Sequence, residues 1–171
     1  MIQIYCGDGK GKTTAALGLA VRAAGSGMHV RFVQFLKGGH TSELNILSGI
    51  PEISVMRCQK NYGFTFRMND LEKTEITNDH NRMLREILSQ IYAGSIQMLI
   101  LDEFFSAYHS HLLDKELANR LVFTCPDQIE LVLTGRNPEQ KFMDIADYIS
   151  EIKAVKHPYQ KGISARLGIE Y

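Results

Sequence analysis

The sequence has no excess of charge of either sign, since 19 Lys and Arg residues balance 19 Asp and Glu residues over 171 positions. Proteins that bind nucleic acid or anionic membranes through bulk electrostatics carry a basic excess. No apolar run approaches the ~20 residues that span a bilayer, and no secretory signal is recognised at the start. We therefore expect a cytoplasmic protein with neither nucleic acid nor a membrane as a partner.

Cysteine is scarce, and its spacing does not suit a metal site. The three cysteines, Cys6, Cys58 and Cys125, form no CxxC pair. Their number and their apolar surroundings favour free, buried thiols in a reducing compartment. The six histidines contain no HxxxH or HExxH pattern. The spacing also indicates no Ser/His/Asp or Cys/His catalytic arrangement, so neither kind of site is predicted.

Short apolar runs alternate with segments of helical periodicity throughout the chain. Strands are predicted at 2–6, 30–36, 53–58, 98–101 and 129–133, with weaker strand signals at 152–155 and 165–169. Helices are predicted at 12–24, 78–93, 114–123 and after Asn137, which suits an N-cap because Pro138 follows it. Apolar strands separated by helices indicate one α/β domain over residues 1–171, with a mostly parallel sheet and helices on both faces.

A glycine-rich segment, GDGKGKTT at 7–14, joins the first predicted strand to the first predicted helix. Its glycines let backbone N–H groups turn inward around a phosphate, and the helix that follows points its positive end at the anion. Lys12 is placed to reach phosphate oxygens, and the Thr13 hydroxyl to bind Mg²⁺. The common pattern GxxxxGK[ST] is not matched to the letter, because Cys6 stands where its first glycine belongs. We nevertheless interpret the segment as a loop that binds ATP or a close relative.

Polar residues follow two of the apolar strands, at the sheet edge where ligand sites of α/β proteins gather. Asp102 and Glu103 end the strand at 98–101, where a carboxylate can hold Mg²⁺. The alternative is that they cap the following turn. Arg136 follows the strand at 129–133 and can clamp a phosphate with two hydrogen bonds, or it can be a solvated loop arginine.

Three aromatic rings occur at alternate positions in an otherwise polar region. Tyr62, Phe64 and Phe66 would point to one side of the chain if the segment were extended. They can pack on the sheet as a small cluster, or they can form an apolar wall for a large flat ligand. Periodicity alone does not choose between these alternatives.

In order along the chain, these segments resemble the P-loop family of CobA-type ATP:corrinoid adenosyltransferases. The resemblance covers nearly the whole chain and rests on GDGKGKTTAALGLAVRAAG at 7–25, VQFLKG at 33–38, GFTF at 63–66, LILDE at 99–103, LTGR at 133–136 and the tail at 144–171. The shortened glycine spacing, the GFTF segment and the VKH…KG…GIEY tail are its most specific parts.

The resemblance implies a RecA-like P-loop fold, usually a homodimer, and a reaction other than phosphoryl transfer. Co(I) of a reduced corrinoid attacks the 5′ carbon of ATP, and the whole triphosphate leaves. An ordinary P-loop ATPase or phosphotransferase that releases ADP remains the alternative, because Lys12, Thr13 and the pair Asp102-Glu103 alone support it. A sensor that binds nucleotide or corrinoid without turnover is a third possibility.

The resemblance also assigns roles to individual residues. Triphosphate binding is expected of Gly7, Asp8, Gly9, Lys10, Gly11, Lys12, Thr13 and Thr14, with Arg136 as the candidate clamp. Mg²⁺, arriving with ATP, is expected on Thr13 and Glu103, with Asp102 in support. Asp8 stands where better-known members carry Asn, which brings a negative charge close to the triphosphate.

Catalytic roles are expected of Lys12 and of two aromatic residues, Phe64 and Phe66. The resemblance implies that the two rings lie against the corrin and displace the lower axial ligand of cobalt. Loss of that ligand raises the Co(II)/Co(I) potential, so that a reduced flavoprotein can supply the electron. Phe66 stands where many members of the family carry Trp.

Overall fold

The computed structural model describes residues 1–58, 60–63 and 65–170, without the side chains of Phe66 and Tyr159. Six strands form one sheet in the order β3-β2-β4-β5-β1-β6, and every neighbouring pair is parallel. The strands are β1 (Ile2–Cys6), β2 (Val30–Gln34), β3 (Ile53–Arg57), β4 (Met98–Asp102), β5 (Glu130–Thr134) and β6 (Tyr148–Glu151). The predicted α/β fold with a parallel sheet is confirmed.

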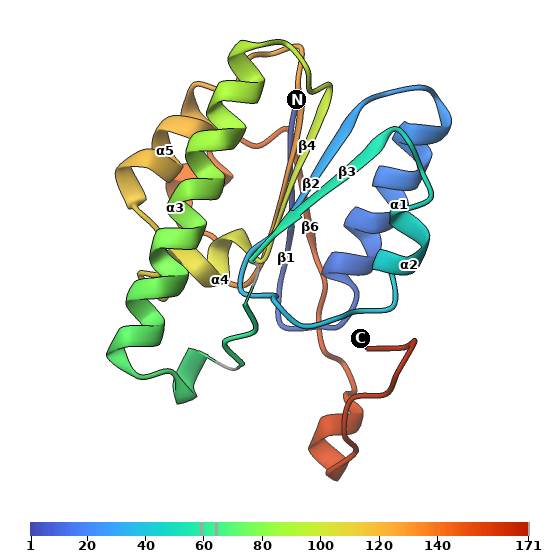
Figure 1. The fold of residues 1–171 in the computed structure, drawn as a ribbon. Coiled ribbons are helices and arrows are strands. Elements are labelled where there is room, and N and C mark those ends of the chain that lie inside the picture. The colour runs from blue at the N-terminus through green and yellow to red at the C-terminus, as the bar shows by residue number, and fades with distance from the viewer. Residues whose placement is uncertain (59, 64, 171) are drawn as a thin grey trace.

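Helices cover both faces of the sheet (Figure 1). One face carries α1 (Lys12–Gly25) and α2 (Leu44–Leu47); the other carries α3 (Asp70–Tyr92), α4 (Phe104–His109) and α5 (Lys115–Phe123). Three short elements complete the fold: η1 (Thr65–Arg67), α6 (Gln140–Met143) and η2 (Pro158–Lys161). Among the described residues, no helix combines the length and apolar character needed to cross a bilayer.

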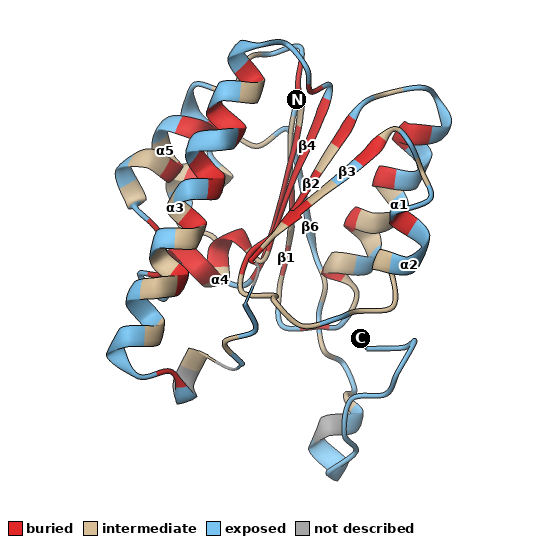
Figure 2. Ribbon diagram, viewed as in Figure 1, coloured by how far each residue is buried: buried red, intermediate tan, exposed pale blue. Residues whose placement is uncertain are grey.

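Each face of the sheet has its own apolar core, and buried positions follow the strands and the inward sides of the helices (Figure 2). Helix α1 lies close to the strands because small residues, Ala16 and Ala20, face Phe32 and Ile100. The opposite core is larger and is built on aromatic contacts around Phe104. The central strand β4 is buried along its whole length. Such packing holds the carboxyl ends of β1, β4 and β5 in fixed positions.

Helix α3 is longer than its apolar stripe predicts. The stripe supports a helix at 78–93, whereas α3 begins at Asp70 because Asn69 and Glu72 form a capping box. The Asn69 side chain accepts from the Glu72 N–H at 2.9 Å, and the Glu72 carboxylate accepts from the Asn69 N–H at 2.9 Å. These first turns are mostly polar and exposed, so hydrophobic periodicity misses them. The predicted cap at Asp114 is confirmed, since its carboxylate accepts from two N–H groups of α5.

The last third of the chain corrects three predictions. Asn137 is not a helix cap: it lies at φ 48°, and the short α6 begins only at Gln140. The last strand is β6, four residues earlier than predicted, where Asp147 binds the backbone of Ile2 and starts a parallel pairing with β1. Its residues are all exposed and therefore lack the apolar signal of a buried strand. The predicted pairing at 165–169 is also wrong, because the described residues 152–170 contain no strand.

A buried histidine makes the fold sensitive to acid. His80 on α3 is fully buried; its Nδ1–H donates to the carbonyl of Leu112 at 2.6 Å, and its Nε2 accepts from the N–H of Leu36 at 3.2 Å. Burial lowers the pKa of His80 to about 4. The unfolded chain takes up a proton below about pH 6.5 and the native state does not, so stability falls as the pH drops from 6.5 towards 4.

We expect the free energy of unfolding to fall by about 2 kcal/mol through His80 alone between pH 7.5 and pH 5.0. Urea unfolding at the two pH values measures it. His80→Gln should be less stable at pH 7.5 but should lose this part of the pH dependence, whereas His29→Gln, at an exposed position, should keep it. An unchanged pH dependence in His80→Gln would show that other groups cause the acid sensitivity.

Candidate functional site

The glycine-rich loop at 7–14 runs from the carboxyl end of β1 into α1 and is fastened to the chain that follows β6. The N–H of Gly9 donates to the carbonyl of Ile152 at 2.8 Å. A Cβ on Gly9 would lie 2.7 Å from that same oxygen, and one on Gly7 would also collide with Ile152. Gly7 and Gly11 have φ values of 102° and 122°, which side-chain-bearing residues rarely adopt. Gly7 and Gly11 are therefore required by their backbone conformation, and Gly7 and Gly9 by the close approach of Ile152.

Lys12 opens α1 and is almost fully buried, with 8% of its surface exposed. Its Nζ donates to the carbonyl of Gly9 at 2.8 Å, which holds the ammonium inside the loop. Burial lowers the pKa of Lys12, and the nearby Glu103 carboxylate opposes that change. The N-cap, Gly11, has no side chain to cap the helix, so the first turn presents N–H groups and the positive end of the helix dipole to the loop. The arrangement suits an anion.

Beside the loop, four side chains form a polar cluster at the ends of β2, β4 and β5. Asp102 is fully buried, and its carboxylate accepts from the hydroxyls of Thr13 at 2.9 Å and Thr134 at 2.7 Å. The Lys37 ammonium lies 2.8 Å from Asp102 Oδ2 and 3.2 Å from Thr13 Oγ1. These hydrogen bonds join the loop to two strands of the sheet.

The oxygen atoms of this cluster fit a divalent cation. A positively charged group, the Lys37 ammonium, already lies where the Thr13 hydroxyl and the Asp102 carboxylate converge, and Mg²⁺ prefers such hard oxygen ligands. No three His, Cys, Asp or Glu side chains come together in the part of the chain that the structure describes. A metal at this place would therefore need further ligands from a bound phosphate.

Glu103 takes an unusual backbone conformation next to the cluster. It lies at φ 57°, its N–H donates to Thr134 Oγ1 at 3.0 Å, and Ser106 Oγ donates to its carboxylate at 2.5 Å. Although Glu103 occupies the N-cap position of α4, its side chain makes no capping hydrogen bond. Its side chain instead helps line a cavity of about 200 Å³ over the loop. The capping alternative therefore does not account for the Asp102-Glu103 pair.

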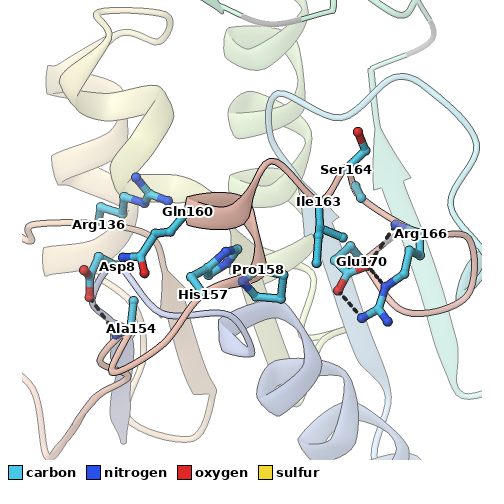
Figure 3. A pocket seen from close by; sticks show the side chains of 11 residues that line it. Asp8, Arg136, Ala154, His157, Pro158, Gln160, Ile163, Ser164, Arg166 and Glu170 are labelled. Atoms are coloured by element: carbon cyan, nitrogen blue, oxygen red, sulfur yellow. Dashed lines mark hydrogen bonds and ion pairs between the residues drawn. The ribbon is translucent and has the colours of Figure 1, made fainter.

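A second cavity, of about 450 Å³, lies between the loop and the C-terminal tail. Figure 3 shows Asp8, Arg136 and Gln160 at one end of it and the Arg166–Glu170 ion pair at the other. Asp8, Arg136, His157 and Glu170 line both this cavity and the one over the loop. Arg136 thus lines the cavity over the loop although it is an exposed residue, and the tail contributes walls to both cavities.

Asp8 is turned towards the tail. Its carboxylate accepts a hydrogen bond from the N–H of Ala154 at 3.1 Å, and this bond is the largest cause of its lowered pKa. The side chain therefore stays ionised and ties the start of the loop to the chain beyond β6. The side-chain oxygen of Asp8 therefore has a structural role.

Comparison with known proteins identifies the family. A family model described as ATP:corrinoid adenosyltransferase BtuR/CobO/CobP matches residues 1–171. The chain belongs to this family. The corrinoid adenosyltransferase of Escherichia coli K12 is 34% identical to it, over 100% of this chain and 85% of the relative. The same shares of both chains and the same identity hold for corrinoid adenosyltransferase CobA of Salmonella typhimurium LT2. The Pseudomonas aeruginosa PAO1 enzyme is 32% identical, over 100% and 83% of the two chains.

Within this family frame, the aromatic segment is only partly described. Phe64 lies outside the described residues, and the side chain of Phe66 is likewise not described. Tyr62 packs against the large core, and its hydroxyl donates to Asp79 at 3.4 Å, so this ring follows the packing alternative. Residues 65–67 form the 3-10 turn η1, so the backbone at this point is not extended.

The structure adds site residues that sequence reasoning did not assign. Lys37 belongs to the VQFLKG match with the adenosyltransferase family, but no role was predicted for it. Its position just after β2, at the carboxyl edge of the sheet, was the available signal. His157, Ile169 and Glu170 reach the loop only through the folded tail, which strand and helix patterns do not describe.

Proposed function

We propose that the protein transfers the 5′-deoxyadenosyl group of ATP to the Co(I) of a reduced corrinoid and releases triphosphate. Membership of the adenosyltransferase family over the whole chain carries this proposal. The loop at 7–14, with Lys12 held inside it and Arg136 lining the cavity over it, supports binding of a triphosphate at that place. No general base is needed, because Co(I) is itself the nucleophile and has no proton to lose.

The chain's own residues have one main task, which is to hold the triphosphate and stabilise the charge that builds on it. As the Co–C5′ bond forms, the C5′–O bond breaks and its electron pair passes to the departing triphosphate. Backbone N–H groups of the loop and the start of α1, with Lys12 and Arg136, would stabilise that charge. Interactions that strengthen as the charge develops lower the barrier, whereas equal binding of substrate does not.

We propose Thr13 and Glu103 as the residues that hold Mg²⁺ with ATP, with Asp102 in support. Asp102 would act through the hydroxyl of Thr13, to which it is hydrogen-bonded at 2.9 Å. When bound, the ion supplies positive charge that neutralises phosphate oxygens. Gly7, Asp8, Gly9, Lys10, Gly11 and Thr14 would complete the loop around the triphosphate.

Product analysis tests the function. The protein is incubated with ATP, Mg²⁺ and chemically generated Co(I) corrinoid, and the phosphate products are separated. Inorganic triphosphate and a new Co–C bond are expected in equal amounts. ADP as the product, formed without a need for corrinoid, would replace this proposal with a P-loop ATPase or phosphotransferase. Binding of ATP or corrinoid with no product would indicate a sensor.

We also propose that Phe64 and Phe66 displace the lower axial ligand of cobalt, and that a reduced flavoprotein is the electron donor. Rings at the reacting metal would exclude water and competing ligands. Phe64→Ala should then nearly abolish turnover with an enzymatic reductant and lower it much less with pre-reduced Co(I). Equal losses in the two assays would rule out the displacement role.

We also propose that the protein is a homodimer in the cytoplasm. Sedimentation velocity tests its oligomeric state.

A further inference from the structure

Lys37 is the one charged member of the polar cluster for which the proposed reaction gives no task. Its ammonium lies 3.2 Å from Oγ1 of Thr13, a proposed metal ligand, and 2.8 Å from Oδ2 of Asp102, the carboxylate that supports it. Asp102 is fully buried, whereas 27% of the Lys37 side chain is exposed. A buried carboxylate needs a positive partner, and Lys37 supplies it from a side that opens to solvent.

The backbone around Lys37 is held in place by contacts with other elements. Leu36 lies at φ 62°, and its N–H donates to Nε2 of the buried His80. The carbonyl of Lys37 accepts from Nε of Arg57 at 3.2 Å. Gly38 packs so closely on the backbone of Lys60 that a Cβ would collide with it. Only the flexible methylene stem of Lys37 is left free to move the ammonium.

An ammonium and a divalent cation cannot share this place. Two positive groups a few ångströms apart, one of them doubly charged, repel each other strongly at the effective dielectric near a protein surface. A metal ion that arrives alone would have to displace Lys37 from Asp102 and bring no compensating negative charge. A metal ion that arrives on a triphosphate brings that charge, and the phosphates offer the displaced ammonium new acceptors.

We propose that Lys37 is the built-in cation of the metal site, which occupies it until a metal–triphosphate complex displaces it. The nucleotide-free protein would then discriminate against free divalent cations and accept the metal only together with nucleotide. Lys37 thereby acts as a positioning and specificity residue for metal entry. The proposal rests on the metal part of the proposed function and is independent of what the adenosyl group is transferred to.

Manganese binding to the nucleotide-free protein tests it, with the free Mn²⁺ signal followed by electron paramagnetic resonance. Lys37→Met keeps the length of the side chain and removes its charge, and it should bind Mn²⁺ at least about tenfold more tightly than the unaltered chain. Lys37→Arg should resemble the unaltered chain. Adding Thr13→Val to Lys37→Met should abolish the gain, which places the ion in this cluster. Equal Mn²⁺ affinity of Lys37→Met and the unaltered chain would overturn the proposal, as would a gain that survives Thr13→Val.

A measurement on the unaltered chain covers the case in which the variants do not fold. The rate at which an amine reagent modifies Lys37, read by mass spectrometry, should be the same without ligand and in excess free MgCl₂. It should change when ATP is added with the MgCl₂. A change with free Mg²⁺ alone would contradict the proposal. Failure of the corrinoid assay, with these results intact, would remove the proposed reaction and leave the role of Lys37 standing.

Discussion

Replacing Lys12 with Met is expected to lower kcat/KM for ATP by about 10²–10³-fold, the loss that follows removal of one preorganised group that stabilises developing charge. Lys12 is nearly buried, and its Nζ is held 2.8 Å from the carbonyl of Gly9 inside the loop. Its charge is thus in place before the triphosphate arrives. Steady-state kinetics with pre-reduced Co(I) corrinoid measures the effect.

The matched control for this change is Lys73→Met, which removes a lysine from the exposed side of α3. It should leave kcat/KM unchanged within about a factor of two, because exposed surface charges away from a site contribute little. A loss of less than tenfold in Lys12→Met, with ATP binding intact, would mean that loop N–H groups and Arg136 hold the triphosphate without Lys12.

Replacing Asp102 with Ala is expected to lower the free energy of unfolding by about 3 kcal/mol in metal-free buffer. The carboxylate is fully buried and is the shared acceptor for Thr13, Thr134 and Lys37. Breaking a buried ion pair by removing one partner costs about 3–5 kcal/mol, and the access of Lys37 to solvent places the cost near the lower limit. Urea unfolding with EDTA present gives the value.

Adenosyl transfer should also fall at least about 100-fold in Asp102→Ala, because Thr13 loses the partner that orients its hydroxyl. Asp102→Asn keeps one acceptor oxygen and should recover part of the stability but little of the activity. Asp127→Ala, at an exposed loop position, should change the free energy of unfolding by less than about 0.5 kcal/mol. Full stability of Asp102→Ala would show that the three donors find other acceptors.

Much of the sheet could be predicted from the sequence because its central strands are buried on both faces. The runs at 2–6, 98–101 and 129–133 are apolar or nearly so, and each becomes a strand within one residue of its predicted ends. Hydrophobic periodicity did not predict the edge strand β6 or the start of α3, because both are largely exposed. Their positions depend on single polar contacts, Asp147 with Ile2 and Asn69 with Glu72.

Most residues of the candidate site could be predicted from the sequence, but the hydrogen bonds between them could not. The positions of Lys12, Thr13 and Asp102 after predicted strands indicated that all three lie at the same edge of the sheet. The structure brings Thr13 and Asp102 within hydrogen-bond distance. The bond from Asp8 to Ala154 joins residues 146 positions apart in sequence, and Lys37 meets Asp102 across 65 positions. No local pattern encodes such pairs, since they depend on strand order and on where the tail turns back.

The contact between Gly9 and Ile152 has a consequence for synthesis of the chain. Strand β1 and the loop at 7–14 leave the ribosome first, yet the carbonyl that fixes the shape of the loop belongs to a residue made near the end. Contacts between such distant residues form late, because a long loop of chain must first be closed. The nascent chain should therefore become able to bind ATP only after nearly all of it has been translated. A truncated product would not bind nucleotide.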